Sequence, residues 1–319
     1  MSAEQIQQTA RVPDALAGMR LDQVAASLFP DWSRARLQEW IRRGWLTVDR
    51  AERKPRDKLH GGEILTLAAS LEAEGDWEPQ PIALDVVHAD AELIVLNKPA
   101  GLVVHPAAGH RDGTLVNALI HHYPELSNLP RAGIVHRLDK DTTGLMVVAR
   151  TLTAHKLLVE QLQARSVSRE YEAVVQGVPT AGGTVDAPIG RHPTQRQRMA
   201  VVAAGKPART HYRVIHRYAG HTHLRCMLET GRTHQIRVHM AHIHHPLVGD
   251  SLYGGRPRPM AGASAALIEY LRAFPRQALH ARRLGLVHPA SGETCAWESP
   301  LPEDFQRLLQ VLQDEESGP

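Results

Sequence analysis

The chain has 319 residues, of which 43% are hydrophobic and 22% charged, and its net charge is only +3. This length allows two domains with a substantial core, and the composition argues against a disordered or fibrous protein. The N-terminus carries no apolar segment of signal-peptide length, and no apolar run approaches the length of a membrane span. Cys226 and Cys295 form no CxxC pair, which argues against a zinc ribbon and fits a reducing compartment. We therefore expect a soluble cytoplasmic protein.

The N-terminal segment predicts a small α+β unit behind a polar leader. Residues 1–17 are polar and predict a loose leader, after which the apolar spacing of RLDQVAASLF predicts a helix. A second helix over SRARLQEWIRR turns Leu37, Trp40 and Ile41 inward, and WLTV and EILTL then predict short strands. The opposite face of the second helix carries four arginines: Arg34, Arg36, Arg42 and Arg43.

An abrupt change of charge marks the end of this unit. Residues 18–67 contain ten Lys or Arg and seven Asp or Glu, whereas residues 68–92 contain seven acidic and no basic residues. We therefore place an acidic linker here and predict domains over residues 18–80 and 81–319. Through RLDQVAASLF and SRARLQEWIRRGWLTV the first domain resembles S4 RNA-binding domains, which implies that its four helix arginines face RNA phosphates. Charge alone is equally compatible with a solvated helix face.

The larger domain shows strands and helices in irregular order. The apolar run ELIVLNKP predicts a central strand, and SREYEAVV alternates so that Tyr171, Ala173 and Val175 share one face. The leucine spacing of TAHKLLVEQLQARS and the apolar side of THQIRVHMAHI predict helices. Without a regular βαβ repeat, the pattern predicts an α+β fold rather than a doubly wound sheet.

Residues 191–217 contain seven basic and no acidic residues. Turn signals on either side of the apolar MAVV predict a hairpin that stands off the domain. A solvated surface segment usually mixes charges, so an all-positive segment favours a polyanionic partner, with Arg196 and Arg198 as candidate contacts.

Five histidines close together raise the question of a metal site: His234, His239, His242, His244 and His245. The segment lacks HExxH spacing, an accompanying carboxylate and a cysteine pair. Core or RNA-facing histidines explain the cluster as well, so we expect no metal site.

The stretch GIVHRLDKDTTGLMVVART begins and ends like a buried strand but is interrupted by polar residues around Asp139. The letters DTTG are favourable turn chemistry, so spacing alone predicts an ordinary turn aspartate. Two other segments favour a catalytic role for Asp139 instead. ETGRTHQIRVH supplies Arg232 and Arg237 at a strand-to-helix turn, and SREYEAVV supplies Tyr171. The sequence has no phosphate-binding glycine loop and no GxSxG nucleophile elbow.

These segments carry a resemblance to a known family. GIVHRLDKDTTGLMVVA, SREYEAVV and ETGRTHQIRVHMAHIHHPLVGDSLYGG resemble the RluA-type pseudouridine synthases, as does ELIVLNKPAGLVVHP. The resemblance implies a mixed, mainly antiparallel sheet and the isomerisation of uridine to pseudouridine in RNA, without metal or cofactor. By motif, Asp139 is then the catalytic carboxylate, Tyr171 stacks on the uracil and assists proton removal from C5, and Arg237 pairs with Asp139.

The same resemblance implies RNA contacts and a substrate. Arg137 is expected to enter the space left by the flipped base, and His136, Arg232 and His234 lie in the same motifs as candidate RNA contacts. The branch of the family that the chain most resembles implies 23S rRNA, either free or in the pre-50S particle, with the helix 69 stem-loop as target and a role in large-subunit maturation. We expect a monomer, because no exposed apolar helix stripe is left unassigned.

The chemistry of the reaction fits these roles. Breaking the C1′–N1 bond builds positive charge on the ribose, so an ionised carboxylate beneath the sugar is needed. A nearby guanidinium favours the charged form of a buried carboxylate. Asp139 then acts as a nucleophile at C1′ or as a base that gives a glycal. Two other functions stay open at this point: a non-catalytic RNA-binding protein, and a metal-dependent nuclease, which needs clustered ligands.

Overall fold

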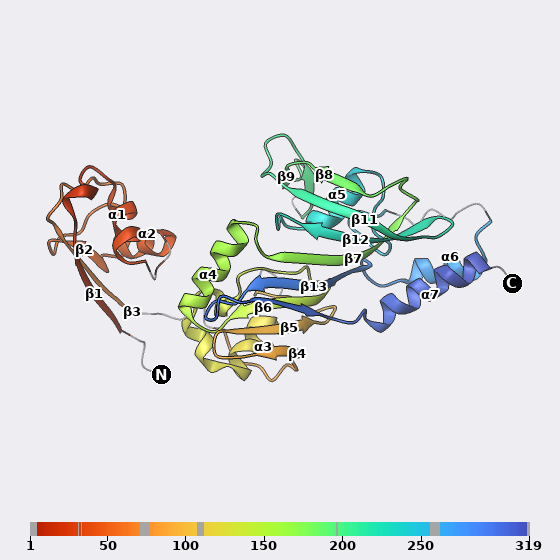
Figure 1. Cartoon of the computed structure of the whole chain (residues 1–319), viewed down its shortest axis with the longest axis horizontal. Helices are drawn as coiled ribbons and strands as arrows, with labels where there is room; N and C mark the ends of the chain where they lie inside the picture. The colour runs from red at the N-terminus through yellow and green to blue at the C-terminus, as the bar shows by residue number, and fades with distance from the viewer. Residues whose placement is uncertain are drawn as a thin grey trace.

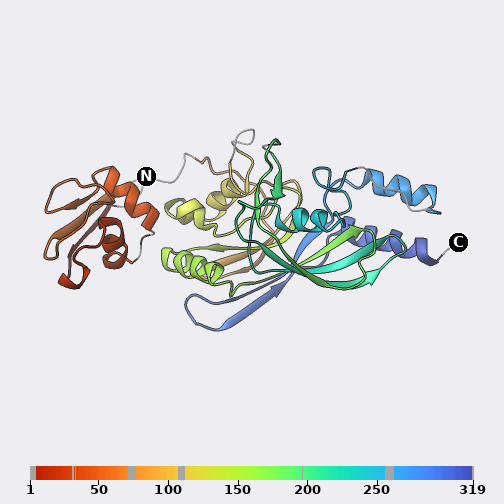
Figure 2. The same ribbon diagram turned by 90° about the horizontal axis from the view of Figure 1, so that it is seen from above.

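The computed structural model describes residues 5–30, 32, 34–70, 77–106, 112–195, 197–255 and 262–317. A small N-terminal unit lies at one end of the molecule, a large sheet fills the middle, and the last helices lie at the other end (Figure 1). The view from above shows the N-terminal unit projecting beyond the sheet (Figure 2). Within the described residues, every helix is too short or too polar to cross a lipid bilayer.

The N-terminal unit is an antiparallel sheet of order β1-β3-β2 covered by two helices. Its elements are β1 (Gln5–Arg11), a 3₁₀ turn (Asp14–Leu16), α1 (Leu21–Leu28), α2 (Arg34–Arg42), β2 (Leu46–Val48) and β3 (Ile64–Ser70). The rings of Trp32 and Trp40 meet edge to face in its core, with their centroids 4.8 Å apart. Both helices and both short strands expected after the leader are therefore present.

Residues 1–17, expected as a loose polar leader, instead supply a strand. Along its whole length β1 pairs with β3, and Val12 is buried in the core of the unit. Because β1 is an edge strand held by backbone hydrogen bonds, its polar side chains gave no strand pattern. Just before the expected boundary at residue 80, Glu78 already contacts the large unit, since Asn117 donates its side-chain amide to the Glu78 carbonyl.

The large unit is built on a nine-stranded sheet of order β4-β5-β6-β13-β7-β12-β11-β8, with β14 paired to β13. Its strands are β4 (Val86–Ala89), β5 (Leu93–Lys98), β6 (Thr143–Ala149), β7 (Ser168–Gln176), β8 (Gly183–Asp186), β11 (Arg209–Arg217), β12 (His221–Leu228), β13 (Leu279–Val287) and β14 (Thr294–Glu298). All these pairings except that of β6 with β13 are antiparallel. The expected mixed, mainly antiparallel α+β fold is confirmed.

Helices cover both faces of this sheet. They are α3 (Leu115–His122), α4 (Leu152–Gln163), α5 (Gln235–His242), α6 (Ala265–Ala273) and α7 (Glu303–Ser317), with a 3₁₀ turn at Pro124–Asn128 and a tight turn at Pro130–Gly133. In β5, Ile94 and Leu96 share a hydrophobic core with α3 and α5, whereas Leu93 and Val95 share another with α4. Burial on both faces explains the near-continuous apolar run of this strand.

The parallel pairing of β6 with β13 forms a seam between two antiparallel halves of the sheet. It spans Thr143 opposite His280 and Gly144 opposite Ala281. Gly144 has a φ of 112°, and a Cβ there would lie 2.3 Å from the Ala281 carbonyl oxygen. A side chain at residue 144 would therefore force the strands apart. The polar loop that carries Asp139 leads directly into this seam.

The stretch before that loop is not the strand that its apolar letters suggested. Pro130–Gly133 forms a tight turn in which Arg131 and Ala132 are left-handed, with φ of 54° and 52°, and Ile134 makes a single antiparallel bridge with Val148 of β6. The loop is therefore held by a strand on its C-terminal side and by a tight turn on its N-terminal side.

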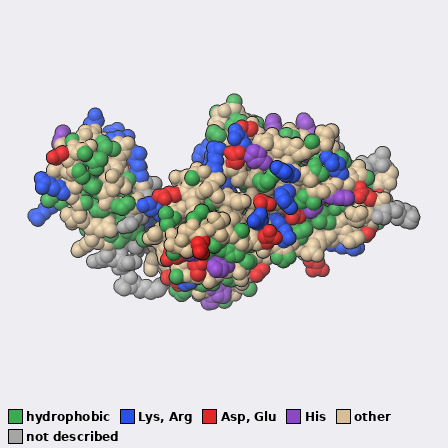
Figure 3. All heavy atoms as spheres, viewed as in Figure 1, with side chains coloured by type: hydrophobic (Ala, Val, Ile, Leu, Met, Phe, Trp, Pro, Cys, Tyr) green, Lys and Arg blue, Asp and Glu red, His purple; other side chains and the backbone are tan. Residues whose placement is uncertain are grey.

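The basic segment 191–217 divides between two sheets. β9 (Ile189–Arg191) and β10 (Met199–Val201) form the separate hairpin that was expected, whereas β11 belongs to the main sheet. Arg196 lies outside the described residues. Figure 3 shows that Lys and Arg side chains on this face of the molecule are interspersed with acidic ones. Within the segment, Arg209 forms an ion pair with Asp186.

Candidate active site

Asp139 lies against a guanidinium that two carboxylates share. Its Oδ2 accepts a hydrogen bond of 2.9 Å from Nη1 of Arg237, on the first turns of α5. The Nε and Nη2 of Arg237 donate to the two carboxylate oxygens of Asp250, at 2.7 and 3.0 Å. The expected pairing of Asp139 with Arg237 is therefore present, across 98 residues of sequence.

Asp250 holds this arginine in place. Its side chain is fully buried, and its Oδ1 also accepts the backbone N–H groups of Leu252 and Tyr253, both at 3.0 Å. Burial alone would lower the pKa of Arg237, but its hydrogen bonds and charge interactions with Asp250 and Asp139 raise it well above its usual value. Sequence reasoning missed Asp250, although it lies in the quoted segment HPLVGDSLYGG.

The exposure of the two carboxylates differs in a way that matters for chemistry. Asp250 is buried and satisfied, while the side chain of Asp139 keeps 17% of its surface exposed. With both carboxylates ionised, the group of one arginine and two aspartates carries a net charge of 1 − 2 = −1. Asp139 is thus an oriented anion that a substrate can reach.

Asp139 and Tyr171 line one cavity of about 560 Å³. Tyr171 is 7% exposed and packs in the core with Ala173 and Val175, which confirms the predicted common face of β7. Burial raises the pKa of Tyr171, an effect that Arg169 opposes and Asp139 reinforces. A cavity of this size accommodates a nucleoside.

Two buried cations fix the backbone of the Asp139 loop. Lys98 donates to the carbonyls of Pro99, Leu102 and Lys140 at 2.7 to 2.9 Å, and burial lowers its pKa to about 8 while Asp141 and Asp139 oppose that shift. Arg276 donates to the Asp141 carbonyl at 3.2 Å and pairs with Asp304 of α7. The loop is therefore positioned from both β5 and the C-terminal helix.

His234 forms the turn at the start of α5 and faces Asp139. It has a left-handed φ of 57°, and its Nε2 lies 3.9 Å from Oδ1 of Asp139. Its Nδ1 lies 2.8 Å from the hydroxyl of Tyr253, which also accepts the backbone N–H of Met199 at 2.9 Å. Burial lowers the pKa of His234, with Asp139 opposing that effect, so the ring is neutral at neutral pH.

Three other predicted RNA contacts also line the cavity: His136, Arg137 and Arg232. Arg137 is exposed, as a residue that enters a vacated base position must be. Arg232 donates its Nε to the Pro207 carbonyl at 3.0 Å. His136 instead accepts the backbone N–H of Val147 at Nε2, and burial with Arg169 nearby lowers its pKa to about 3. Its Nε2 thus holds the backbone of β6, and His136 stays a predicted RNA contact that lines the cavity.

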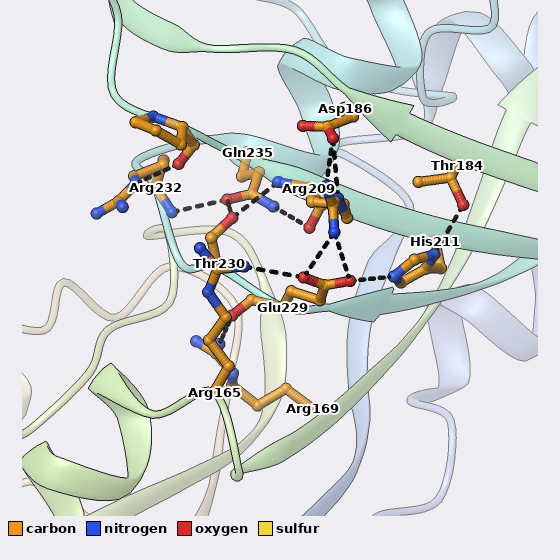
Figure 4. A network of polar contacts seen from close by, with 11 residues as sticks. Arg165, Arg169, Thr184, Asp186, Arg209, His211, Glu229, Thr230, Arg232 and Gln235 are labelled. Carbon is orange, nitrogen blue, oxygen red and sulfur yellow. Dashed lines mark hydrogen bonds and ion pairs between the residues drawn. The ribbon is translucent and has the colours of Figure 1, made fainter.

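A polar network on strands β8, β11 and β12 continues the same cleft (Figure 4). The Glu229 carboxylate interacts with Arg165 at 3.0 Å, Arg209 at 3.4 Å and His211 at 2.7 Å. Gln235 closes the turn between β12 and α5 by accepting from Thr230 and from the Arg232 backbone. The cations of this rim are therefore largely paired before any ligand binds.

The predicted arginines outside the cavity have distinct surroundings. Arg34 pairs with buried Asp22 at 2.7 Å, so its main contact is internal. Arg36 lies over the ring of Trp40 and Arg43 over that of Trp45, while Arg42 is exposed on the last turn of α2. In the large unit, Arg198 lies over the ring of Tyr253.

The clustered histidines do not converge on one point in the described part of the chain, where no group of three or more metal-ligating side chains occurs. His239 is fully buried, with its ring nitrogens 2.9 Å from the Thr210 hydroxyl and the Ala187 carbonyl. It is a satisfied core histidine, which agrees with the structural interpretation of this cluster.

Comparisons with known proteins agree with this geometry. Residues 92–242 match the family model of RNA pseudouridylate synthase. The chain is 64% identical to ribosomal large subunit pseudouridine synthase D of Pseudomonas aeruginosa over 99% of both chains, and 57% identical to that of Escherichia coli K12 over 97% of this chain and 95% of the other. The structure of human RNA pseudouridylate synthase domain containing 4 matches with a TM-score of 0.58 and 28% identity, covering 72% of this chain and 93% of that one. The chain therefore belongs to the RluA-type family of RNA pseudouridine synthases.

Proposed function

We propose that this pseudouridine synthase modifies uridines of 23S ribosomal RNA in the helix 69 stem-loop. The observation that carries the proposal is Asp139, a partly exposed carboxylate paired with Arg237, in the same cavity as Tyr171. The similar proteins from P. aeruginosa and E. coli are named for the large ribosomal subunit, which supports ribosomal RNA as substrate. The target loop follows from the branch of the family that the motifs resemble.

The proposed reaction uses this geometry and needs no cofactor. The flipped uridine stacks on Tyr171 with its ribose above Asp139, which acts as nucleophile at C1′ or as base toward a ribose proton. In both cases the C1′–N1 bond breaks and its electron pair leaves with the uracil. The cavity retains the ring while it turns. C5 then bonds to C1′ as the ester bond between Asp139 and C1′ breaks or, in the glycal route, as Asp139 returns its proton to C2′. The C5 proton is removed with the help of Tyr171, and N1 gains a proton.

RNA reaches this cavity across basic surfaces. We propose that Arg137 fills the vacated base position and that Arg232 and Arg198 contact the backbone near the cavity. On the N-terminal unit, proposed to act as an S4-like RNA-binding domain, exposed Arg42 and the stacked Arg36 and Arg43 contact phosphates at a distance. The protein acts as a monomer in the cytoplasm, on free rRNA or the pre-50S particle, during large-subunit maturation.

Tritium release tests the activity and its centre together. With 23S rRNA labelled at uridine C5, and EDTA present, we expect the intact protein to release tritium and Asp139→Asn to lose at least about 10⁴-fold in rate. Asp250→Asn is the comparison variant, because it changes the neighbouring carboxylate on the same arginine and is expected to lose only about 100-fold in rate. Equal rates for Asp139→Asn and the intact protein would contradict the assignment.

Mapping of the product tests the substrate. We expect pseudouridine in the loop of helix 69 and none in an rRNA from which that stem-loop is deleted. Modification of bulk tRNA or of another rRNA stem, with helix 69 untouched, would overturn the substrate proposal and leave the enzyme class intact.

A further inference from the structure

Arg169 is a buried guanidinium that no carboxylate neutralises among the described residues. It lies on β7 two residues before Tyr171, so the two side chains share a face of the strand about 7 Å apart. The residue is 7% exposed and lines the same cavity as Asp139. Its Nη2 donates to the Glu229 carbonyl over a long 3.4 Å, and its Nε has no acceptor within the described part of the chain. Burial lowers the pKa of Arg169, but a guanidinium keeps its charge in proteins.

The carboxylates nearby are already committed to other cations. Glu229 directs its side chain to Arg165, Arg209 and His211, and only its backbone carbonyl turns to Arg169 (Figure 4). Asp139 and Asp250 share Arg237. A buried cation without such a partner is costly to the fold, and its cost is offset when an anion forms beside it.

We propose that Arg169 stabilises the uracil ring while it is detached from the ribose as an anion. This inference rests on the proposed function. When the C1′–N1 bond breaks, the electron pair of that bond stays on uracil N1 and spreads over O2 and O4. This holds whether Asp139 acts as nucleophile or as base. The ring rests on Tyr171, next to Arg169, in a site whose Asp139–Arg237–Asp250 group carries a net charge of −1.

The burial of Arg169 decides which ligand it serves. A phosphate bound through the Nε–Nη edge would need an accessible Nε, but the Nε of Arg169 is buried. A positive charge in a low-dielectric environment acts over several ångströms without contact, and it is in place before the reaction begins. Exposed Arg137 is screened by solvent, so Arg169 is the better placed of the two to compensate the charge of the ring.

Leaving-group acidity tests this role. Single-turnover rates are measured on a helix 69 stem-loop with uridine or 5-fluorouridine at the target, by following loss of the N-linked nucleoside in a nuclease digest. Fluorine makes uracil N1 more acidic, so the departing ring needs less stabilisation. We expect Arg169→Met to slow uridine cleavage about 100-fold but 5-fluorouridine cleavage only about tenfold, and Arg169→Lys, which keeps the charge, to stay within about tenfold on both. The RNA dissociation constant is expected to stay within about twofold of the intact protein.

Two outcomes overturn the inference. Equal slowing of both substrates shows a structural role in placing Tyr171, whereas weaker RNA binding with a salt slope lowered by about one shows a phosphate contact. If Arg169→Met does not fold, Arg169→Gln is compared in the same way. Arg272→Met removes an exposed charge from α6 and is the matched control, with no expected change. Failure of the intact protein to convert uridine in any RNA would instead refute the proposed function.

Discussion

Two aspartates, one in each unit of the molecule, are both held by arginine side chains. They differ in how many hydrogen bonds they accept and in how much of their surface stays exposed. Asp22, in the N-terminal unit, is fully buried and accepts hydrogen bonds from Arg20, Arg34 and Gln38. Asp139 accepts one hydrogen bond from Arg237 and keeps part of its surface open to the cavity. A carboxylate whose hydrogen bonds are all satisfied stabilises a fold, whereas a partly satisfied one beside a cavity can act on a substrate.

The pairing of Asp139 with Arg237 is stable because a second carboxylate, that of Asp250, anchors the arginine. The bidentate contact with Asp250 fixes the guanidinium plane, and the remaining Nη1 then points at Asp139. The orientation of Asp139 therefore depends on Asp250, which lies outside the cavity lining.

Among the variants that test how the two aspartates are held, Asp250→Asn has the largest expected effect. It removes the charge that balances buried Arg237, which should lower the free energy of unfolding by about 3 kcal/mol. Loss of orientation at Asp139 should lower the single-turnover rate about 100-fold. Urea unfolding and tritium release measure the two effects. An unchanged rate in a folded variant would show that Asp139 orients itself.

Asp22→Asn removes the buried carboxylate of the N-terminal unit. Its partners Arg20 and Arg34 remain about half exposed, so the expected loss of stability is smaller, about 2 kcal/mol. The single-turnover rate at saturating RNA should stay near that of the intact protein, because the residue lies in the N-terminal unit. A large fall in that rate would contradict the division of roles between the two aspartates.

Acid is expected to destabilise the large unit, which holds Asp139, through two buried histidines. Burial lowers the pKa of both His221 and His280 to about 4, whereas the unfolded chain protonates them near 6.5. Between pH 6.5 and 4 the unfolded state therefore binds more protons, and the free energy of unfolding falls with decreasing pH by about 1.4 kcal/mol per unit for each histidine. Urea unfolding across this range should show that the free energy of unfolding depends less steeply on pH in His221→Asn than in the intact protein. An unaltered slope would show that His221 does not contribute to the pH dependence.

Arg42→Gln has the smallest expected effect. The residue is exposed on α2, so its loss should weaken RNA binding only a few-fold and lower the salt slope of the dissociation constant by about one. Arg34→Gln is the informative partner, because it should cost stability through Asp22 more than affinity. Binding that is insensitive to both changes would remove α2 from the RNA-contacting surface.

Local patterns predicted the elements that pack against a core. The helices α1, α2, α4 and α5 and the Tyr171 face of β7 follow from apolar spacing, because burial imposes that spacing. Strand β1 was missed because its pairing is a backbone property that its polar side chains do not reveal. The seam between β6 and β13 was equally invisible, since it joins residues more than 130 positions apart.

The site shows the same division between local and distant information. Asp139, Tyr171 and Arg237 were found through motifs, and the structure brings the first and third together. Asp250 and Arg169 lie in those motifs, but the motifs assigned them no role. Their roles depend on contacts in space: Asp250 binds Arg237, and Arg169 has no carboxylate partner among the described residues. Arg34 was assigned to RNA because spacing placed it on a basic helix face, whereas its partner Asp22 lies on the preceding helix.

The seam also sets the order in which the protein acquires activity. Asp139 lies before β6, but the strand that completes its support, β13, begins at Leu279, and the helix that holds Arg276 comes later still. During synthesis the N-terminal unit can fold early, whereas the loop that carries Asp139 is supported only once the last part of the chain has been made. A nascent chain that stops before Leu279 is therefore expected to bind RNA without isomerising uridine, so that modification begins only with the finished protein.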